Sequence, residues 1–139
     1  MGRRGFTLTE VLIAVTLVGI LASASVANYV TAVQRTRWDT ARQILLQIYD
    51  GENQFFAANN AFVGPITCAT LQDGGVGVVS WRRSLNMDHP CPPGVVNPVT
   101  YAVALIAGPG FTVTATNVAA ATTQTIDQNR TFGGTWVRP

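Results

Sequence analysis

The chain has 139 residues, 47% of them hydrophobic, and a mean hydropathy of +0.25, which fits one small domain joined to a long apolar segment. All nine basic residues are arginines, against seven acidic residues, and two of these arginines, Arg3 and Arg4, lie within the first five residues. Without residues 1–5 the chain keeps seven basic and seven acidic side chains, so net basicity does not predict nucleic-acid binding.

The N-terminal segment has the length and composition of a membrane helix. After Glu10, the next 24 residues carry no charge, and the run from Val11 to Val33 is almost entirely apolar. At about 1.5 Å of rise per residue, roughly 20 apolar residues cross a bilayer core. Arg3 and Arg4 precede this run, so we expect the N-terminus in the cytoplasm and the rest of the chain outside it. Glu10 then needs a role, because a carboxylate in a membrane segment is usually functional.

The stretch Gly5-Phe6-Thr7-Leu8-Thr9-Glu10 resembles the processing site of type IV pilins and pilin-like proteins. The resemblance implies that a prepilin peptidase cuts between Gly5 and Phe6 and methylates the new amine of Phe6. It also implies that Glu10 pairs with the N-terminal amine of a neighbouring subunit during filament assembly. Thr9 departs from the family, in which an aliphatic residue is more usual.

An ordinary secretory signal peptide is the alternative interpretation of the same segment. Arg3 and Arg4 would be its basic region, Val11–Leu21 its apolar region and Ala22-Ser23-Ala24 its small-residue cleavage site. The mature chain would then start near Ser25. The helical pattern continues beyond Ala24, which favours the pilin interpretation.

Residues 34–60 have the pattern of an amphipathic helix that ends near Asn59-Asn60. Apolar residues recur at three- and four-residue steps, which predicts one face packed on a core: Trp38, Ala41, Leu45, Ile48 and Phe55. The charged residues are expected largely elsewhere around the helix: Arg35, Arg37, Asp39, Arg42, Asp50 and Glu52. A Trp and Phe stripe of this kind indicates core packing and not a cofactor site.

Residues 61–98 form a loop-rich region that contains both cysteines. Outside the cytoplasm, Cys68 and Cys91 most simply form one disulfide, worth about 3 kcal/mol for the 22 residues between them. Two free thiols remain an alternative, and a zinc site using Asp88-His89-Pro90-Cys91 is a weaker one. A helical turn is expected at Thr70–Gln72 and an extended piece at Gly77–Ser80.

The C-terminal region, residues 99–139, alternates in the manner of an antiparallel sheet. The expected strands are Thr100–Ala107, Phe111–Asn117, Thr125–Gln128 and Thr131–Val137. The predicted fold class is α+β, with a three- or four-stranded antiparallel sheet laid on the second half of a long helix. This is the type IV pilin fold that the resemblance implies.

The sequence holds no arrangement typical of an enzyme, no cofactor motif and no metal-ligand spacing. Trp81-Arg82-Arg83 combines an aromatic ring with two cations, the residue types that contact nucleic acid, and Arg130, Trp136 and Arg138 are candidate neighbours in the sheet. The alternative is that Arg82 and Arg83 pair with Asp73 or Asp88. Asn129-Arg130-Thr131 matches the N-glycosylation triplet, which also occurs by chance.

The resemblance implies a non-catalytic structural subunit of a type IV pilus. Its parts would be a cleaved leader (residues 1–5), a membrane and filament-core helix (6–33) and a globular pilin domain (34–139). Its partners would be further copies and other pilins in a helical filament, the prepilin peptidase, and the inner membrane before export to an extracellular pilus serving motility, adhesion or DNA uptake. The alternatives are a type II secretion pseudopilin and a minor pilin that binds DNA. Major pseudopilins hold calcium in a C-terminal acidic loop, whereas here Asp127 is the only acidic residue after Asp88.

Overall fold

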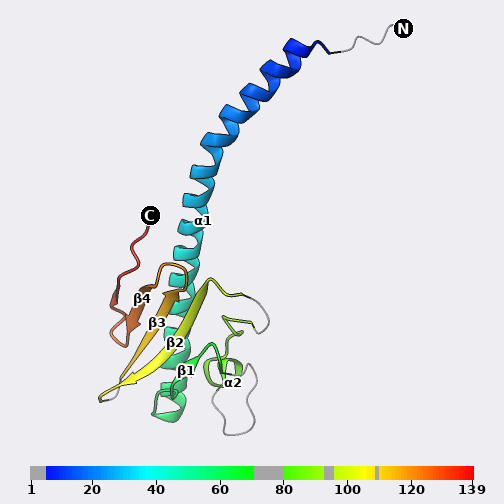
Figure 1. Ribbon diagram of the computed structural model, residues 1–139. Coiled ribbons are helices and arrows are strands. Elements are labelled where there is room, and N and C mark those ends of the chain that lie inside the picture. The colour runs from blue at the N-terminus through cyan, green and yellow to red at the C-terminus, as the bar shows by residue number, and fades with distance from the viewer. Residues whose placement is uncertain (1–5, 71–79, 93–95, 109) are drawn as a thin grey trace. The chain divides into compact units, whose positions relative to one another are not determined.

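The computed structural model describes residues 6–70, 80–92, 96–108 and 110–139, apart from the side chains of Ala24 and Ala27. The chain divides into two compact units, residues 1–36 with Pro139 and residues 37–138. The long helix α1, Leu8–Asn59, contributes 52 residues to the two units (Figure 1).

In the first unit, α1 exposes apolar side chains all round. The large exposed hydrophobic side chains include Leu8, Val11, Leu12, Ile13, Val15, Leu17, Val18, Ile20, Leu21, Val26, Tyr29 and Val30. Among the described residues, α1 is the one helix long and apolar enough to cross a membrane by length and composition, and its most apolar window is not buried in the structure.

The C-terminal end of α1 has a left-handed cap. Asn60, the residue after the helix, has φ = 53°, and its N–H donates to the carbonyl of Phe56 at 2.7 Å. Asparagine tolerates this conformation better than most residues and is a common alternative to glycine at this position. The predicted helix end near Asn59-Asn60 is therefore confirmed.

The second unit contains a five-stranded antiparallel sheet whose strand order follows the chain, β1-β2-β3-β4-β5 (Figure 1). The strands are β1 Ile66–Thr67, β2 Val99–Ile106, β3 Gly110–Asn117, β4 Thr122–Asp127 and β5 Phe132–Gly134. Strands β2 to β5 each pair with the next through a short connection and form a meander, whereas a much longer connection separates β1 from β2. The pairing of β2 and β3 is the longest, with eight residue pairs.

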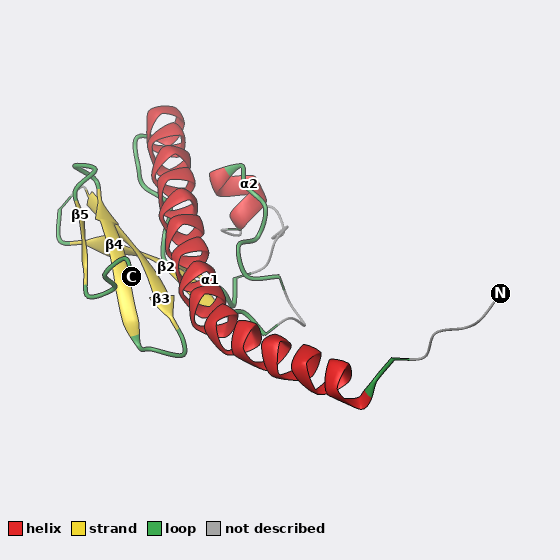
Figure 2. Ribbon diagram, turned by 90° about the horizontal axis from the view of Figure 1, so that it is seen from above, coloured by secondary structure: helices red, strands yellow, loops and turns green. Residues whose placement is uncertain are grey.

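One face of the sheet packs on the second half of α1, as Figure 2 shows from above. Strand β3 alternates, with Phe111, Val113 and Ala115 buried and the threonines between them only half-buried. The residues of α1 that meet the core include Ala41, Leu45 and Ile48, each with no exposed surface. The ring of Tyr49 lies 5.9 Å from that of Phe111. The predicted α+β pilin fold, with its core stripe on the helix, is confirmed.

Two short elements were not predicted from the sequence. Strand β1 is only two residues long, and α2, Trp81–Leu85, is a single turn capped by the Ser80 hydroxyl, which accepts from the Arg83 N–H at 3.2 Å. Neither is long enough to show a period in the sequence. Helix α2 lies close to α1 at Gly51, where an added Cβ would come within 2.7 Å of the Leu85 carbonyl oxygen. The expected pieces at Thr70–Gln72 and Gly77–Ser80 fall mostly outside the described residues.

Glu52 corrects the helix prediction, because it lies on the buried stripe and not among the exposed charges. It follows Ile48 by one helical turn and has no exposed surface. One carboxyl oxygen, Oε2, accepts the Val63 N–H at 3.0 Å, and Oε1 has no hydrogen-bond partner in the described part of the chain. Burial raises the pKa of Glu52 from 4.5 to about 7, although the bond from Val63 opposes the shift.

The burial of Glu52 predicts that the free energy of unfolding falls as the pH rises. Because the folded pKa lies above the unfolded one, protonated Glu52 favours the fold below about pH 4.5, and this contribution is lost as the pH rises through 7. Ionisation at pH 8 is expected to lower the free energy of unfolding by about 3 kcal/mol. Glu52→Gln removes the ionisation and keeps an oxygen for Val63, so it should flatten the pH dependence and stabilise the protein at pH 8.

Urea unfolding of the full chain in detergent between pH 5 and pH 8 measures this effect. Asp50→Asn, on the exposed side of the same helix turn, is the matched control and should leave the pH dependence of the parent chain in place. If the free energy of unfolding of Glu52→Gln depended on pH as steeply as that of the parent chain, ionisation of Glu52 would not destabilise the fold.

Candidate functional site

The first turn of α1 is closed by a reciprocal pair of side chains, Thr7 and Glu10. The Glu10 N–H donates to the Thr7 hydroxyl oxygen at 3.3 Å, and the Thr7 N–H donates to Glu10 Oε2 at 3.4 Å. The Thr7 hydroxyl also reaches Oε2, at 3.5 Å. A threonine before the helix and a glutamate three residues later form a capping box, which satisfies N–H groups that have no partner within the helix.

The capping box leaves most of the Glu10 carboxylate available. Its contacts within the described chain are long, they all use Oε2, and the side chain is exposed. A carboxylate offers about four acceptor positions on its two oxygens. Glu10 can therefore cap its own helix and still accept an N–H from a second group.

Of the two residues at the expected cleavage point, Phe6 lies just before the helix. Phe6 is 82% exposed, and Gly5 lies outside the described residues. The structure places Phe6 and Glu10 within the same short segment at the start of α1. The cleavage, the methylation and the pairing of Glu10 with an amine remain predictions.

The capping role of Glu10 was missed in the sequence analysis, although its signal is present there. Thr7-Leu8-Thr9-Glu10 has the threonine and glutamate spacing of a capping box and directly precedes an apolar run. The residue therefore has two roles to separate, one within its own chain and one proposed between chains.

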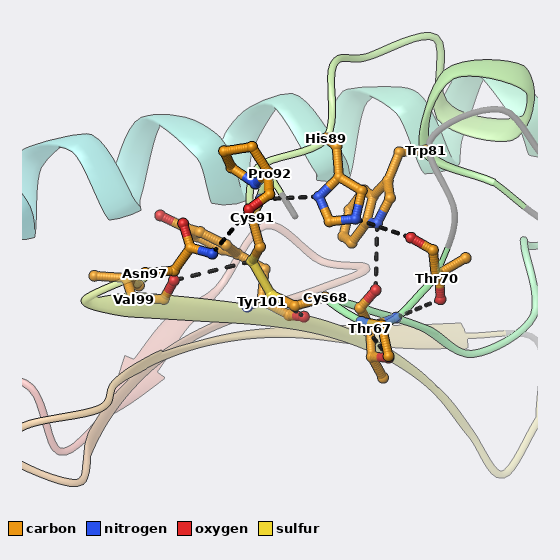
Figure 3. The surroundings of a disulfide bond; sticks show 11 residues. Thr67, Cys68, Thr70, Trp81, His89, Cys91, Pro92, Asn97, Val99 and Tyr101 are labelled. Atoms are coloured by element: carbon orange, nitrogen blue, oxygen red, sulfur yellow. Dashed lines mark hydrogen bonds between the residues drawn. A yellow bond between two sulfur atoms is a disulfide. The ribbon is translucent and has the colours of Figure 1, made fainter. Parts of the chain in front are cut away.

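The predicted disulfide between Cys68 and Cys91 is present, so the alternative of two free thiols is wrong. The two Cα atoms are 5.4 Å apart, and Cys68 directly follows β1. The Tyr101 N–H of strand β2 donates to the Cys68 sulfur at 3.0 Å (Figure 3). The disulfide thus closes the connection between β1 and β2, and the hydrogen bond from Tyr101 holds the start of this connection against β2.

His89 stands beside the disulfide and uses both ring nitrogens on the backbone (Figure 3). Nδ1 accepts the Cys91 N–H at 2.9 Å, and Nε2 lies 2.9 Å from the Thr70 carbonyl oxygen, to which it donates in the neutral ring. With Cys91 in a disulfide and both nitrogens engaged, the zinc alternative is not supported. Among the described residues, no group of three or more His, Cys, Asp or Glu side chains could hold a metal ion.

The Trp81-Arg82-Arg83 cluster is divided between core and surface. Trp81 has no exposed surface, and its indole N–H donates to the Thr67 carbonyl at 3.3 Å, so its ring is not available for stacking on a base. Arg82 and Arg83 are exposed, and Arg82 pairs with Asp88 at 3.1 Å. This is one of the ion pairs expected as the alternative, while Asp73 lies outside the described residues.

The other residues considered for that cluster lie near the opposite edge of the sheet. Trp136 follows β5, and its N–H donates to the Thr123 carbonyl at 2.8 Å, whereas Trp81 contacts β1. Arg138 pairs with Asp39 at 2.9 Å and lies over the Trp38 ring at 5.7 Å. The two groups of aromatic and basic residues therefore do not form one surface, and nucleic-acid contact remains an untested prediction.

Comparisons with known proteins agree with the pilin interpretation of the N-terminal segment. Residues 1–26 match the family model described as the prokaryotic N-terminal methylation motif. Over 59 residues the chain is 32% identical to the type IV major pilin protein PilA of Myxococcus xanthus (strain DK1622). That alignment covers 42% of this chain and 27% of the relative, so the chain spans about a quarter of the length of the pilin that it matches. The comparison with solved structures found no significant match.

The disulfide predicts a measurable loss of stability when it is removed. Opening a loop with a sequence separation of 23 should lower the free energy of unfolding by about 3 kcal/mol. The variant with Cys68→Ser and Cys91→Ser should therefore unfold at lower urea than the parent chain. Dithiothreitol should destabilise the parent to a similar extent and leave the double variant unchanged; equal midpoints for parent and variant would contradict a structural role.

Proposed function

The methylation motif and the matched pilin support a type IV pilin family for this chain, and on that basis we propose that it is a structural, non-catalytic subunit of a type IV pilus. The chain is inserted with its N-terminus in the cytoplasm and is cut between Gly5 and Phe6 by a prepilin peptidase. It is methylated at Phe6 and polymerised through α1 into an extracellular filament. The observation that carries the proposal is the motif over residues 1–26 at the head of an exposed apolar helix.

The apolar half of α1 suits two successive environments, the bilayer before assembly and the filament after it. Before assembly, its 24 uncharged residues suit a bilayer core, and Glu10 lies at the end nearest the cytoplasm. A carboxylate in hydrocarbon is unfavourable by about 2.5–3.5 kcal/mol on insertion scales unless it lies near the interface or meets a cation. In the filament, the amine of Phe6 from another copy is that cation.

The sequence offers Glu10 few cationic partners other than the amine of Phe6. The sequence contains no lysine, so the N-terminal amine is the one amine that an unmodified chain offers to a carboxylate. The arginines of the processed chain begin at Arg35, far along the helix from Glu10. Within the apolar part of an array of these helices, the amine of Phe6 is therefore the natural cationic partner for Glu10.

Substitutions at the capping box separate the two roles of Glu10. Glu10→Gln keeps a capping-box residue but removes the charge, and Glu10→Ala removes both. If the carboxylate pairs with an amine, both variants should remain membrane-inserted and assemble roughly ten- to hundredfold less well, the equivalent of about 1.5–3 kcal/mol for a hydrogen bond to a charged group. Sheared pili, quantified by immunoblot and electron microscopy, give the measurement.

Thr7→Ala is the matched control, because it removes the capping hydroxyl and leaves the charge of Glu10. It should weaken the first helix turn by about 1 kcal/mol and still allow filaments. Normal filaments from Glu10→Gln together with poor filaments from Thr7→Ala would mean that Glu10 acts as a helix cap, and the pairing would be refuted.

Carbodiimide coupling tests the pairing directly in isolated filaments, since it joins a carboxylate to an amine without a spacer. Filaments grown from a mixture of ¹⁴N- and ¹⁵N-labelled subunits should yield mixed-isotope peptides that join Phe6 to Glu10. A secondary N-methyl amine still forms the amide. Cross-links confined to single copies, or joining Phe6 to other carboxylates, would place Glu10 away from the amine.

The pseudopilin alternative predicts a different use of the C-terminal acidic residue. In the structure, Asp127 Oδ1 accepts the N–H groups of Asn129 and Thr131 at 2.9 and 2.8 Å, which occupies this carboxylate in closing a turn. This observation favours the pilus subunit. Cryo-electron microscopy of sheared surface filaments tests the proposal as a whole: this chain traced in the repeating density supports it, and surface filaments built without the chain would overturn it.

A further inference from the structure

The turn between β4 and β5 contains an Asn-x-Thr triplet, Asn129-Arg130-Thr131, the only Asn-x-Ser/Thr sequence in the chain. All three residues are exposed. Strand β4 ends at Asp127 and β5 begins at Phe132, so the triplet forms the tip of the last hairpin of the sheet. This is the surface-loop setting that N-linked glycosylation requires.

Asp127 holds the backbone of the turn, so the side chains of the triplet are not needed to stabilise it. Asp127 Oδ1 accepts the N–H groups of Asn129 and Thr131, and the Asp127 carbonyl accepts the Arg130 N–H at 2.9 Å. Arg130 completes the turn with φ = 62°. Within the described residues, neither the Asn129 carboxamide nor the Thr131 hydroxyl makes a hydrogen bond. A group attached to Asn129 Nδ2 would therefore break no hydrogen bond within the described residues.

We propose that Asn129 is the acceptor of an N-linked glycan, added on the outer side of the cytoplasmic membrane. The inference rests on the proposed function for its topology, which places the sheet outside. The donor is a polyprenyl-diphosphate-linked oligosaccharide. Asn129 Nδ2 forms a bond to the anomeric carbon of the first sugar, the bond from that carbon to the diphosphate oxygen breaks, and polyprenyl diphosphate leaves with the electron pair. One amide proton passes to a base of the transferase.

The position also gives the glycan a physical effect. Strand β5 is an edge of the sheet and pairs with β4 through only three residues, so the turn can open for a transferase at little expense to the sheet. Exposed edge strands can pair with strands of other molecules. A hydrated glycan beside β5 would hinder such pairing between neighbouring sheets.

Mass spectrometry of the protein purified from the envelope of its native cells tests the proposal. We expect at least one sugar residue on the peptide that contains Asn129. The modification should disappear in Asn129→Gln and in Thr131→Ala, persist in Thr131→Ser, and persist in the control Asn53→Gln, an exposed asparagine outside any triplet. Far-UV circular dichroism and melting temperature should stay close to those of the parent chain in the three triplet variants, because the Asn129 and Thr131 side chains make no hydrogen bond within the described residues.

The same spectra keep this proposal separate from the proposed function. A methylated Phe6 at the N-terminus with an unmodified Asn129 would overturn the glycan and leave the pilin processing intact. An N-terminus near Ser25 with a glycan on Asn129 would overturn the pilin processing and support the glycan. A sugar that survives in Thr131→Ala would also overturn the proposal, because the attachment would not depend on the triplet.

Discussion

One helix with two kinds of surface governs this molecule. Over the first part of α1, apolar side chains point in every direction, and no other described part of the chain covers them. From Trp38 onward the apolar side chains fall on one stripe, which the sheet of the same chain covers. Burying one Val, Leu or Ile side chain is worth about 1.5–3 kcal/mol, so the uncovered part must find lipid or other proteins. The sheet and the disulfide-closed connection serve the half of α1 that this chain can cover by itself.

The segment between α1 and β2 is held by a few specific contacts and by two short elements, β1 and α2. Strand β1 adds two residue pairs to β2, the disulfide joins Cys68, just after β1, to Cys91 later in the same connection, and α2 rests on α1 where Gly51 has no side chain. His89 and Glu52 each accept one backbone N–H in this region. Polar groups inside a small domain must find such partners, because an unpaired buried polar group is unfavourable by about 1–3 kcal/mol.

The sequence predicted the parts of the fold that depend on periodic patterns. The helix end, the stripe of Ala41, Leu45 and Ile48, and the β2–β3 hairpin all followed from spacing and turn residues. Strand β1 and helix α2 escaped because two and five residues are too short to show a period. The prediction that Glu52 is exposed was wrong because it rested on the charge of the residue. Its spacing from Ile48 puts it on the buried stripe. Trp81 was read as a surface residue because it adjoins two arginines, whereas the helical turn points it into the core.

The sheet has a consequence for the order in which the chain folds. Because the strand order follows the chain, the contacts of β2 to β5 form between near neighbours, and such local contacts close quickly. The pairing of Ile66 with Val103 spans a far longer loop, and the disulfide bridges the same region. We therefore expect the three hairpins of β2 to β5 to form first and β1 to pair with β2 later. The disulfide would then form within a sheet that already exists. In that order, the thiols come together through folding, and an oxidase need only act on a pair that the chain has already aligned.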